Sequence, residues 1–319
     1  MKVGIICSHG GHLTEMRYLL NELKLKDYFI ISYDSATTRA LNGKKFLFPN
    51  FGSKPWKIIK YIPYFIKILL SEKPDILVSN GAEIAIPFFI IGKIFKIRTI
   101  FIECYTRVDQ PTVSGKILFP FVNEFIIPWL ELQEYYGNKA KYIGNLITIT
   151  DIKFTDLGNK TGILVIVGMH DKNFDRLVKY LDLNATNIKY PIIIQKGASE
   201  YQPINCSYFD YCSYEDMQRY IEKSKLVVCQ GGITIIDCLL QGTKVIAFPR
   251  KKEWGEAIND HQLIFSEKLM RLNLISVVTE AHDLFDRIDF DYNEEPIVVK
   301  INDEYIRNFK RLLDCEHVL

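Results

Sequence analysis

The sequence predicts an α/β protein of two domains, each built on a parallel β-sheet with helices on both faces. Two observations carry this prediction. Short apolar runs alternate with helical stretches, which is the pattern of a parallel sheet that is covered on both sides. The same alternation starts again after a polar, turn-rich segment, and 319 residues suffice for two cores of ordinary size.

The first series of elements lies before residue 150. Its predicted strands cover residues 3–7, 28–32, 75–79 and 98–103, and its helices begin near Thr14 and span Trp56–Leu70, with an apolar segment at 84–95. The second series begins after Gly158, with predicted strands at 162–168, 191–197, 226–232 and 244–249 and helices at 174–180, at 215–223 and from Thr234. The turn-rich segment between the series places the domain boundary at 157/158, which gives domains 1–157 and 158–319.

A last helix is expected over Asp303–Leu319. Its apolar residues recur at the three-and-four spacing of one helix face, at Tyr305, Ile306, Phe309, Leu312 and Leu313. Such a face needs a surface on which to pack.

Composition excludes several classes of protein. The formal net charge of +2 leaves no basic excess for nucleic acid. The seven cysteines are odd in number and never spaced as CxxC, so we expect no disulfide framework and no zinc site, and a reducing cytosol fits. MKVGIIC is interpreted as a first strand and not as a secretory signal. Residues 84–102 are interrupted by charges, so no transmembrane helix is expected.

Glycine-containing turns follow one predicted strand in each half and lead into a helix. This arrangement directs free backbone N–H groups and the positive end of the helix at an anion such as a diphosphate. The first turn holds Gly10 and Gly11, followed by His12 and Glu15.

The second turn holds Gly231 and Gly232, with Thr234 able to cap the helix and Asp237 placed to accept hydrogen bonds from a ribose. It lacks the GxGxxG spacing and comes late in the chain, which disfavours a dinucleotide site. A third stretch follows the strand that ends at Pro249, and its polar residues suit sugar hydroxyls: Glu256, Asn259, His261 and Gln262.

With these stretches the chain resembles, over nearly its whole length, a fusion of the two subunits of the N-acetylglucosaminyltransferase that builds dolichol-linked oligosaccharide. It resembles still more closely the paired bacterial capsule and exopolysaccharide glycosyltransferases of that family. The matching motifs of the first half are SHGGHLTEM, SNGAEIAIP and FIECYTRVDQPTVSGKILFP. Those of the second half are VGMHDKNFDRLV, IIIQKGASEY, QGGITIIDCLLQGTKVIAFPR and GEAINDHQ.

The family is similar to the peptidoglycan lipid II synthase within the GT-B superfamily. The resemblance implies two Rossmann-like domains with parallel sheets facing a central cleft, the first binding the acceptor and the membrane surface and the second binding a UDP-sugar. It implies a hexosyltransferase that moves a sugar, with inversion and without a cofactor, to a polyprenyl-diphosphate-linked saccharide in polysaccharide or glycan biosynthesis. It also implies a cytoplasmic protein, peripheral on the inner face of the cell membrane, whose C-terminal helix returns to the first domain.

The resemblance also assigns site residues. The donor should be surrounded by Gly168, His170, Gln195, Gly197, Gly231, Gly232, Thr234, Asp237, Arg250, Glu256, Asn259, His261 and Gln262. The acceptor should face Gly10, Gly11, Glu15, Asn80, Gly81 and Arg107. His12 is the preferred catalytic base because a loop imidazole titrates near neutral pH, and Glu103 is the alternative.

A metal ion is not required for such a transfer. The helix start at Gly231–Thr234, the Gly168 loop and Arg250 can meet the charge that develops on the leaving UDP. Asp289 and Asp291 spell the DxD motif of another glycosyltransferase fold, but we interpret them as a solvated pair in an acidic loop.

Four positions depart from the family, which usually has His at Gln230, Thr at Met169, Glu at Asp237 and His at Ala257. All four belong to the expected donor site. They leave two other interpretations open: a catalytically weakened subunit that presents a lipid-linked sugar to a partner enzyme, and a UDP-sugar epimerase.

The segment Trp56–Leu70 has the composition of a membrane-interface segment, although Pro63 interrupts its helix and the lysines do not all share one face. Its charges are all lysine, and they stand among aromatic residues that suit the headgroup layer. A buried crossover helix with lysines that snorkel to the surface is the alternative.

Overall fold

The structure is a computed structural model that describes residues 1–52, 55–150, 160–169 and 172–314. The chain divides into two compact units, which are Met1–Leu146 together with Ile301–Leu319 (unit 1) and Ile147–Lys300 (unit 2). The boundary expected at 157/158 lies outside the described residues.

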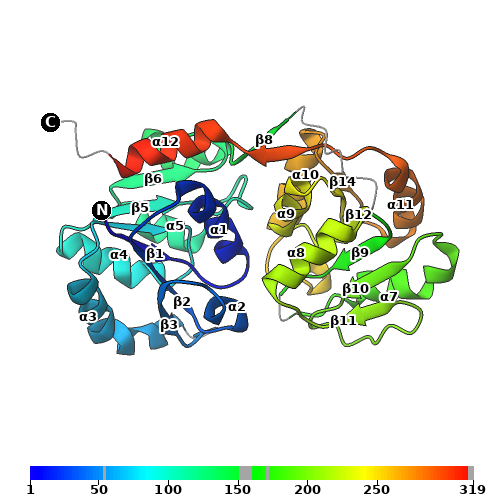
Figure 1. The fold of residues 1–319 in the computed structure, drawn as a ribbon, viewed down its shortest axis with the longest axis horizontal. Coiled ribbons are helices and arrows are strands. Elements are labelled where there is room, and N and C mark those ends of the chain that lie inside the picture. Colours follow the sequence, from blue (N-terminus) through cyan, green and yellow to red (C-terminus); the bar gives the residue numbers. More distant parts are fainter. Residues whose placement is uncertain (53–54, 151–159, 170–171, 315–319) are drawn as a thin grey trace. The chain divides into compact units, whose positions relative to one another are not determined.

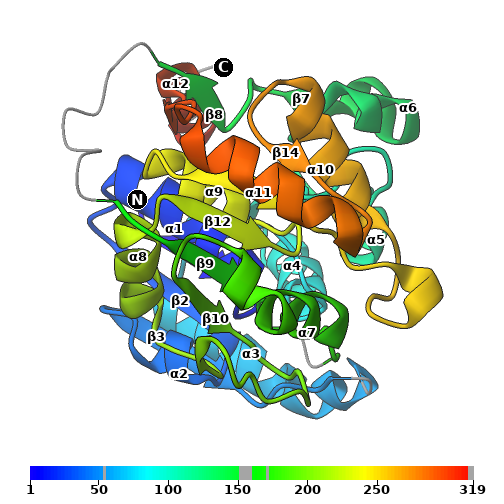
Figure 2. The same cartoon turned by 90° about the vertical axis from the view of Figure 1, so that its right-hand side faces the viewer.

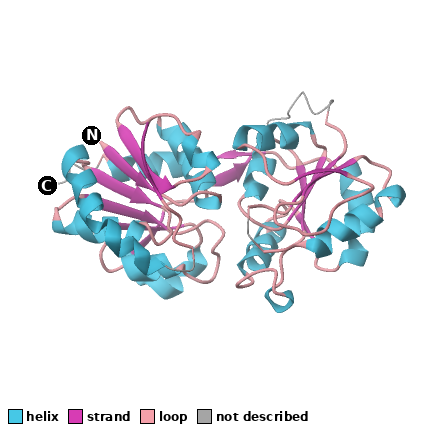
Figure 3. Ribbon diagram, turned by 90° about the horizontal axis from the view of Figure 1, so that it is seen from below, coloured by secondary structure: helices cyan, strands magenta, loops and turns pink. Residues whose placement is uncertain are grey.

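Unit 1 contains a fully parallel sheet of seven strands in the order β3-β2-β1-β4-β5-β6-β7. The strands are β1 (Val3–Ile6), β2 (Tyr28–Tyr33), β3 (Lys44–Phe48), β4 (Ile76–Ser79), β5 (Arg98–Ile102), β6 (Glu124–Ile127) and β7 (Ala140–Tyr142). The predicted α/β class is confirmed, and Figure 3 shows helices on both sides of the strands.

Alternate residues of β1 face opposite layers of unit 1. Val3 and Ile5 point to α1 (Gly11–Leu23) and α12 (Asp303–Leu313), where Phe309 and Leu313 lie beside them. Ile6 points to the core on the opposite face, which is formed with α3 (Ile62–Glu72), α4 (Ala85–Ile94) and α5 (Val113–Leu118). Two short helices, α2 (Ala36–Arg39) and α6 (Gln133–Tyr136), complete the unit.

The C-terminal helix α12, red in Figure 1, packs on α1 within unit 1. It begins at Asn302, whose side chain caps Glu304 N–H at 2.9 Å and whose own N–H donates to Leu146 O at 2.9 Å. The helix ends at Leu313, so it is shorter than the expected helix over residues 303–319; residues 315–319 lie outside the described part.

Unit 2 contains a second parallel sheet, in the order β11-β10-β9-β12-β13-β14. The strands are β9 (Ile163–Ile166), β10 (Ile192–Gln195), β11 (Ser207–Phe209), β12 (Leu226–Cys229), β13 (Lys244–Ala247) and β14 (Ser276–Val277). Figure 2 looks onto this unit, with β10, β9 and β12 side by side. A further ladder pairs β8 (Ile147–Ile149) with β15 (Val299–Ile301).

The helices of unit 2 follow its strands. They are α7 (Asp175–Leu183), α8 (Tyr214–Lys223), α9 (Thr234–Leu240), α10 (His261–Arg271) and α11 (Leu284–Asn293). The side chains of α7 and α11 form one apolar core with residues of β9, β10, β12 and β13. The predicted helix from Thr234 begins where expected.

Some expectations about elements were wrong. The helical segment Trp56–Leu70 is divided near Pro63, as expected, but its first half is a 3-10 helix over Pro55–Tyr61 that precedes α3, because proline is accepted only in the first turn of an α-helix. Asp289 and Asp291 lie on α11 and not in a loop. Asp291 is buried against Arg287 at 2.7 Å and Asp289 pairs with Lys189 at 3.2 Å, so the two carboxylates have different partners.

Candidate functional site

Loops at the carboxyl ends of β1, β4 and β5 bring most predicted residues of unit 1 together. These strands are neighbours in the sheet, and the carboxyl edge of a parallel sheet is where α/β proteins bind ligands. A small cavity at this edge is lined by Glu15, Asn80, Glu103 and Tyr105, and also by Tyr305 from α12.

Glu15 is a buried carboxylate held by two donors. One oxygen accepts the backbone N–H of Tyr105, and the other accepts Asn80 Nδ2 at 2.9 Å. Burial raises the pKa of Glu15 to about 8, although both donors oppose that shift. Glu15 is therefore largely protonated at neutral pH.

His12 lies in the first turn of α1, next to Asn80 and Gly81. Asn80 Nδ2 also donates to the backbone oxygen of His12 at 2.7 Å. A Cβ atom at Gly81, whose φ is +127°, would stand 2.9 Å from the imidazole Cε1, so glycine leaves room for the ring. Burial lowers the pKa of His12 to about 4, so its imidazole is neutral at physiological pH.

Three further predicted acceptor residues, Gly10, Gly11 and Arg107, belong to unit 1. Gly10 has φ 78° and precedes α1, while Gly11 opens that helix at an exposed position. The positive charge of Arg107 contributes to lowering the pKa of His12.

Glu103, the alternative base, is fully buried and engaged with the protein. Its carboxylate accepts Tyr136 OH at 2.6 Å, Thr112 N–H at 3.2 Å and Cys104 N–H at 2.9 Å. Because these bonds tie the loop after β5 to the start of α5, we interpret Glu103 as a residue that orders this loop.

In unit 2 the predicted residues Gly168, Gln195 and Gly197 form one cluster at the ends of β9 and β10. Gln195 accepts Gly168 N–H at 2.9 Å and donates to Gly168 O at 3.2 Å, so its amide fixes the glycine loop. Both glycines have positive φ, and a Cβ atom at Gly197 would lie 2.9 Å from Gly168 O.

The glycine turn after β12 adjoins this cluster. A Cβ atom on Gly168 would collide with the Gln230 amide, and one on Gly231 would lie 3.1 Å from the backbone oxygen of Gln262. The side-chain oxygens of Gln230 and Gln262 are buried and have no hydrogen-bond partner among the described residues. Buried acceptors without donors are rare, so this cluster offers polar groups for a ligand to satisfy.

The turn continues into α9, whose first residue is Thr234. Asp237, one turn later, is buried and accepts Tyr214 OH from α8 at 3.2 Å. Tyr214 is a neighbour that sequence reasoning did not identify, because its place beside Asp237 follows only from the packing of α8 on α9.

Two predicted donor residues have structural roles instead. Arg250 is 1% exposed, and its guanidinium donates to the carbonyl oxygens of Val167, Lys172, Asn173 and Glu256. Glu256 forms a two-point ion pair with Arg176, with both N–O distances 3.0 Å. These bonds hold neighbouring loops together and occupy both charged groups within the protein.

Asn259 and His261 are paired at the start of α10. Asn259 Oδ1 contacts His261 Nδ1, an arrangement that fixes the ring tautomer and leaves Nε2 as an acceptor. His170, also expected at the donor, lies outside the described residues. Met169 is exposed and Ala257 is buried.

Comparison with known proteins matches each half to a different family. Residues 49–146 match the model described as "Oligosaccharide biosynthesis protein Alg14 like", and residues 162–302 match "Glycosyltransferase family 28 C-terminal domain". The chain is thus a glycosyltransferase with two Rossmann-like units of the GT-B class, as the sequence predicted. More particularly, it joins an Alg14-like segment to a family 28 C-terminal domain in one polypeptide.

Individual relatives support both halves. The UDP-N-acetylglucosamine transferase subunit alg14 of Schizosaccharomyces pombe is 29% identical over 165 residues, covering 42% of this chain and 78% of the relative. The pyrophosphoryl-undecaprenol N-acetylglucosamine transferase of Clostridium botulinum is 24% identical over 293 residues, covering 78% and 79%. A crystal structure of the UDP-GlcNAc 2-epimerase from Neisseria meningitidis shares the fold, with a TM-score of 0.68, 11% identity and coverage of 98% and 99%.

Proposed function

We propose that this protein transfers a hexose from a UDP-sugar to a saccharide carried on a polyprenyl diphosphate, with inversion at the anomeric carbon. One observation carries the proposal: in each unit the predicted residues gather at the carboxyl ends of parallel strands, where such sheets bind ligands. The similar Clostridium enzyme is named for a transfer of this kind.

The donor site of the proposal is the glycine cluster of unit 2, formed by the loops after β9, β10 and β12. Backbone N–H groups around Gly168, Gly231 and Gly232 would contact the diphosphate, and Asp237 would accept hydrogen bonds from the ribose. The unpartnered amide oxygens of Gln230 and Gln262 would accept hydroxyl groups of the nucleotide sugar.

The chemical step assigns His12 as the base. The acceptor hydroxyl gives its proton to the neutral imidazole while its oxygen attacks the anomeric carbon from the face opposite UDP. The bond from that carbon to the UDP oxygen breaks, and UDP leaves with the electron pair. The lowered pKa of His12 keeps its nitrogen available for this proton down to acidic pH.

A lipid-linked acceptor must be bound at a membrane surface. Unit 1 exposes aromatic and aliphatic side chains together with lysines, which suit such a surface. Trp56, Ile59 and Tyr64 are 61, 62 and 47% exposed, and Ile94 on the adjacent α4 is 70% exposed. Lys57, Lys60 and Lys67 are exposed along the same segment. We name this surface, which also includes Val113 on α5, the α3–α5 surface, and propose that it lies on the membrane face that carries the acceptor.

No helix in the described ranges is both long and apolar enough to cross a bilayer. Attachment through the α3–α5 surface would therefore be interfacial, with apolar side chains at the headgroup level and lysines near anionic lipid. We propose the cytoplasmic leaflet as that surface.

The test is a transfer assay with the purified full chain, a panel of UDP-sugars and a polyprenyl-diphosphate-linked saccharide. We expect release of UDP that depends on the acceptor. His12→Ala should lower kcat by about 10²- to 10⁴-fold while UDP binding is retained. Glu103→Gln serves as the comparison, since a loop-ordering residue should affect stability along with activity.

Two outcomes would favour the competing interpretations. Tight binding of UDP-sugar and lipid acceptor without UDP release, under conditions where a partner enzyme restores it, would indicate a binding subunit. Conversion of UDP-N-acetylglucosamine without any acceptor would indicate an epimerase, the activity of a solved structure that shares this fold.

A further inference from the structure

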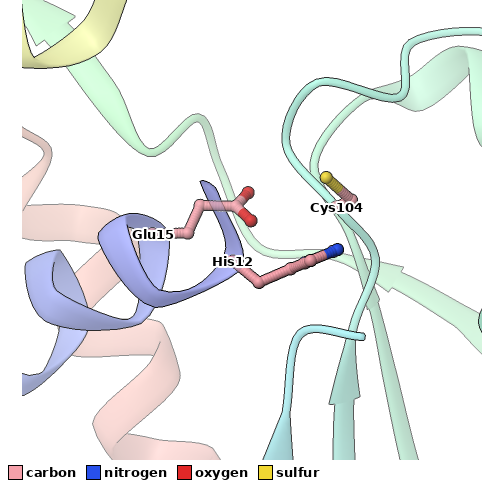
Figure 4. A group of neighbouring side chains, drawn as sticks. All are labelled: His12, Glu15 and Cys104. Atoms are coloured by element: carbon pink, nitrogen blue, oxygen red, sulfur yellow. The ribbon is translucent and has the colours of Figure 1, made fainter. Parts of the chain in front are cut away.

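Three potential metal ligands surround one point in unit 1. An imidazole nitrogen of His12, a carboxylate oxygen of Glu15 and the sulfur of Cys104 lie within 4.8 Å of one another. Figure 4 shows the side chains converging from the first turns of α1 and from the loop after β5. Among the residues that the structure describes, no other group of His, Cys, Asp and Glu meets this condition.

The ligand types favour zinc. A nitrogen, an oxygen and a sulfur together suit a borderline-soft ion, whereas calcium and magnesium prefer oxygen alone. The Nδ1 atom of His12 is buried and has no hydrogen-bond partner among the described residues. The imidazole is thus not committed to another protein group through that atom.

The surrounding bonds match those that orient metal ligands. Asn80 Nδ2 and the Tyr105 N–H hold the Glu15 carboxylate in place, and the hydroxyl of Thr106 lies 3.2 Å from Cys104 Sγ. Ligating groups are normally fixed by hydrogen bonds of this kind from a second layer of residues.

The distances between the three ligand atoms are slightly longer than those around a bound zinc ion. Ligand atoms around a tetrahedral zinc ion lie about 3.3–3.8 Å apart, so these side chains would close by about 1 Å. His12 and Cys104 are both partly exposed, which permits rotation about their side-chain bonds and gives the ion an entry route. Three protein ligands leave a fourth position open for water or substrate.

We propose that His12, Glu15 and Cys104 form a zinc site, and that zinc bound there inhibits sugar transfer. On binding, the Cys104 thiol and the protonated Glu15 carboxyl group each release a proton to solvent, and the two residues ligate as thiolate and carboxylate. The ion occupies the imidazole lone pair that would otherwise accept the proton of the acceptor hydroxyl. The inhibition rests on the proposed function, whereas the binding does not.

Sequence spacing did not indicate this site, because Cys104 is 89 residues from Glu15 and belongs to no CxxC motif. Only the adjacency of β1, β4 and β5 brings the two loops together.

Binding is tested with cobalt as a spectroscopic substitute for zinc. The full chain, stripped with a chelator, is titrated with Co²⁺, and we expect a thiolate-to-cobalt charge-transfer band that Zn²⁺ abolishes by displacement. Cys104→Ser should remove the band and weaken Zn²⁺ at least about tenfold in competition with a chromophoric chelator. Cys212→Ser, a partly exposed cysteine of unit 2, is the matched control and should keep both.

Asn80→Ala should weaken zinc by about 10- to 100-fold, because it releases the Glu15 carboxylate. Absence of the charge-transfer band in the folded parent, or its persistence in Cys104→Ser, would overturn the site. Thermal unfolding of each variant shows whether it folds.

Inhibition is tested separately. Zn²⁺ should reduce transfer by the parent and by Cys212→Ser, and should leave transfer by Cys104→Ser unchanged. Zinc binding without loss of transfer would overturn the inhibitory role. A parent that binds cobalt but transfers no sugar would count against the proposed function, while the metal site would stand.

Discussion

At the scale of single residues, the two positions after β12 that hold glycine differ in how strictly the fold requires it. Gly231 has φ +91°, and a Cβ atom there would stand 2.6 Å from Ser266 Oγ. Gly232 has no positive φ, and a Cβ atom there would approach only Gln230 Nε2, at 3.4 Å. Gly231 is therefore required by the fold, whereas the fold tolerates a side chain at Gly232.

This difference separates folding from ligand binding. Gly231→Ala should lower the free energy of unfolding by about 1–3 kcal/mol, because it combines strain with a steric contact. Gly232→Val should unfold near the parent temperature yet lose UDP-sugar affinity, because its side chain blocks the backbone's approach to phosphate. Calorimetric titration with UDP and thermal unfolding measure the two effects. Unchanged UDP affinity in folded Gly232→Val would argue against the diphosphate position.

His12 and Glu15 predict an unusual pH profile. Since the pKa of His12 is lowered to about 4, protonation of the base should not reduce kcat/KM until the pH falls far below 6.5. Since the pKa of Glu15 is raised to about 8, a change in rate near that pH should disappear in Glu15→Gln. The measurement is kcat/KM from pH 5 to 9 in both proteins. An acidic limb near pH 6.5 in the parent would show that the pKa of the base is not lowered by burial.

At the scale of elements, the strands and helices with strong apolar patterns were predicted from sequence. The runs that became β1, β4, β9 and β12 are short, apolar and buried on both faces, a pattern that local sequence displays directly. Four of the missed strands, β3, β7, β11 and β14, end the two sheets, where half-exposed backbone tolerates polar residues such as Lys44. The interior strand β6 was missed as well, although three of its four residues are buried.

The candidate site was less predictable than the elements. Its glycines and His12 stand in recognisable turns, but the partners of each group depend on tertiary packing. Arg250 illustrates this limit, because an arginine beside a predicted diphosphate site proved to be caged by backbone carbonyls. Tyr305 illustrates it too, since α12 carries it from the end of the chain to the cavity at Glu15.

One contact between elements predicts an acid-sensitive contribution to stability. Asp182, the penultimate residue of α7, accepts N–H groups of Ile204, Asn205 and Cys206 and the hydroxyl of Tyr201. Burial alone would raise the pKa of Asp182, but these donors lower it below its ordinary value of 3.8. Its stabilising effect is therefore present above about pH 4 and lost as the pH falls through the lowered value.

Asp182→Asn should cost about 1.5–3 kcal/mol at pH 7, because it replaces a charged acceptor of several hydrogen bonds. The deficit relative to the parent should shrink as the pH drops below 3.8, where the parent carboxylate becomes protonated. Denaturant unfolding at pH 7 and pH 3 measures it. Glu200→Gln, an exposed carboxylate near the same loop, is the control and should change stability little at either pH. A deficit that is constant with pH would refute the linkage.

At the scale of the whole molecule, the two faces of the unit 1 sheet are covered by different sets of helices. One face is closed by α1 and by α12, which the chain supplies after completing unit 2. The other is covered by α3, α4 and α5, whose outer sides carry exposed aromatic and aliphatic residues together with lysines. Phe65, Ile68 and Leu69 face the core, so one side of α3 is buried as the alternative interpretation required, while contact of its exposed side with a membrane stays a prediction.

The α3–α5 surface predicts binding to anionic membranes. Each lysine near an anionic surface contributes about 1 kcal/mol, falling with salt, so Lys57, Lys60 and Lys67 together contribute about 3 kcal/mol at low ionic strength. The full chain should sediment with vesicles containing anionic lipid, and changing all three lysines to Glu should abolish sedimentation while UDP binding is retained.

Changing Lys179, Lys189 and Lys223 of unit 2 to Glu alters net charge equally and should leave sedimentation nearly unchanged, because these exposed lysines lie outside the surface. Equal loss in both triple variants would show that net charge rather than this surface governs binding. Sedimentation of the first variant at the level of the parent at low salt would show that the protein meets the membrane elsewhere.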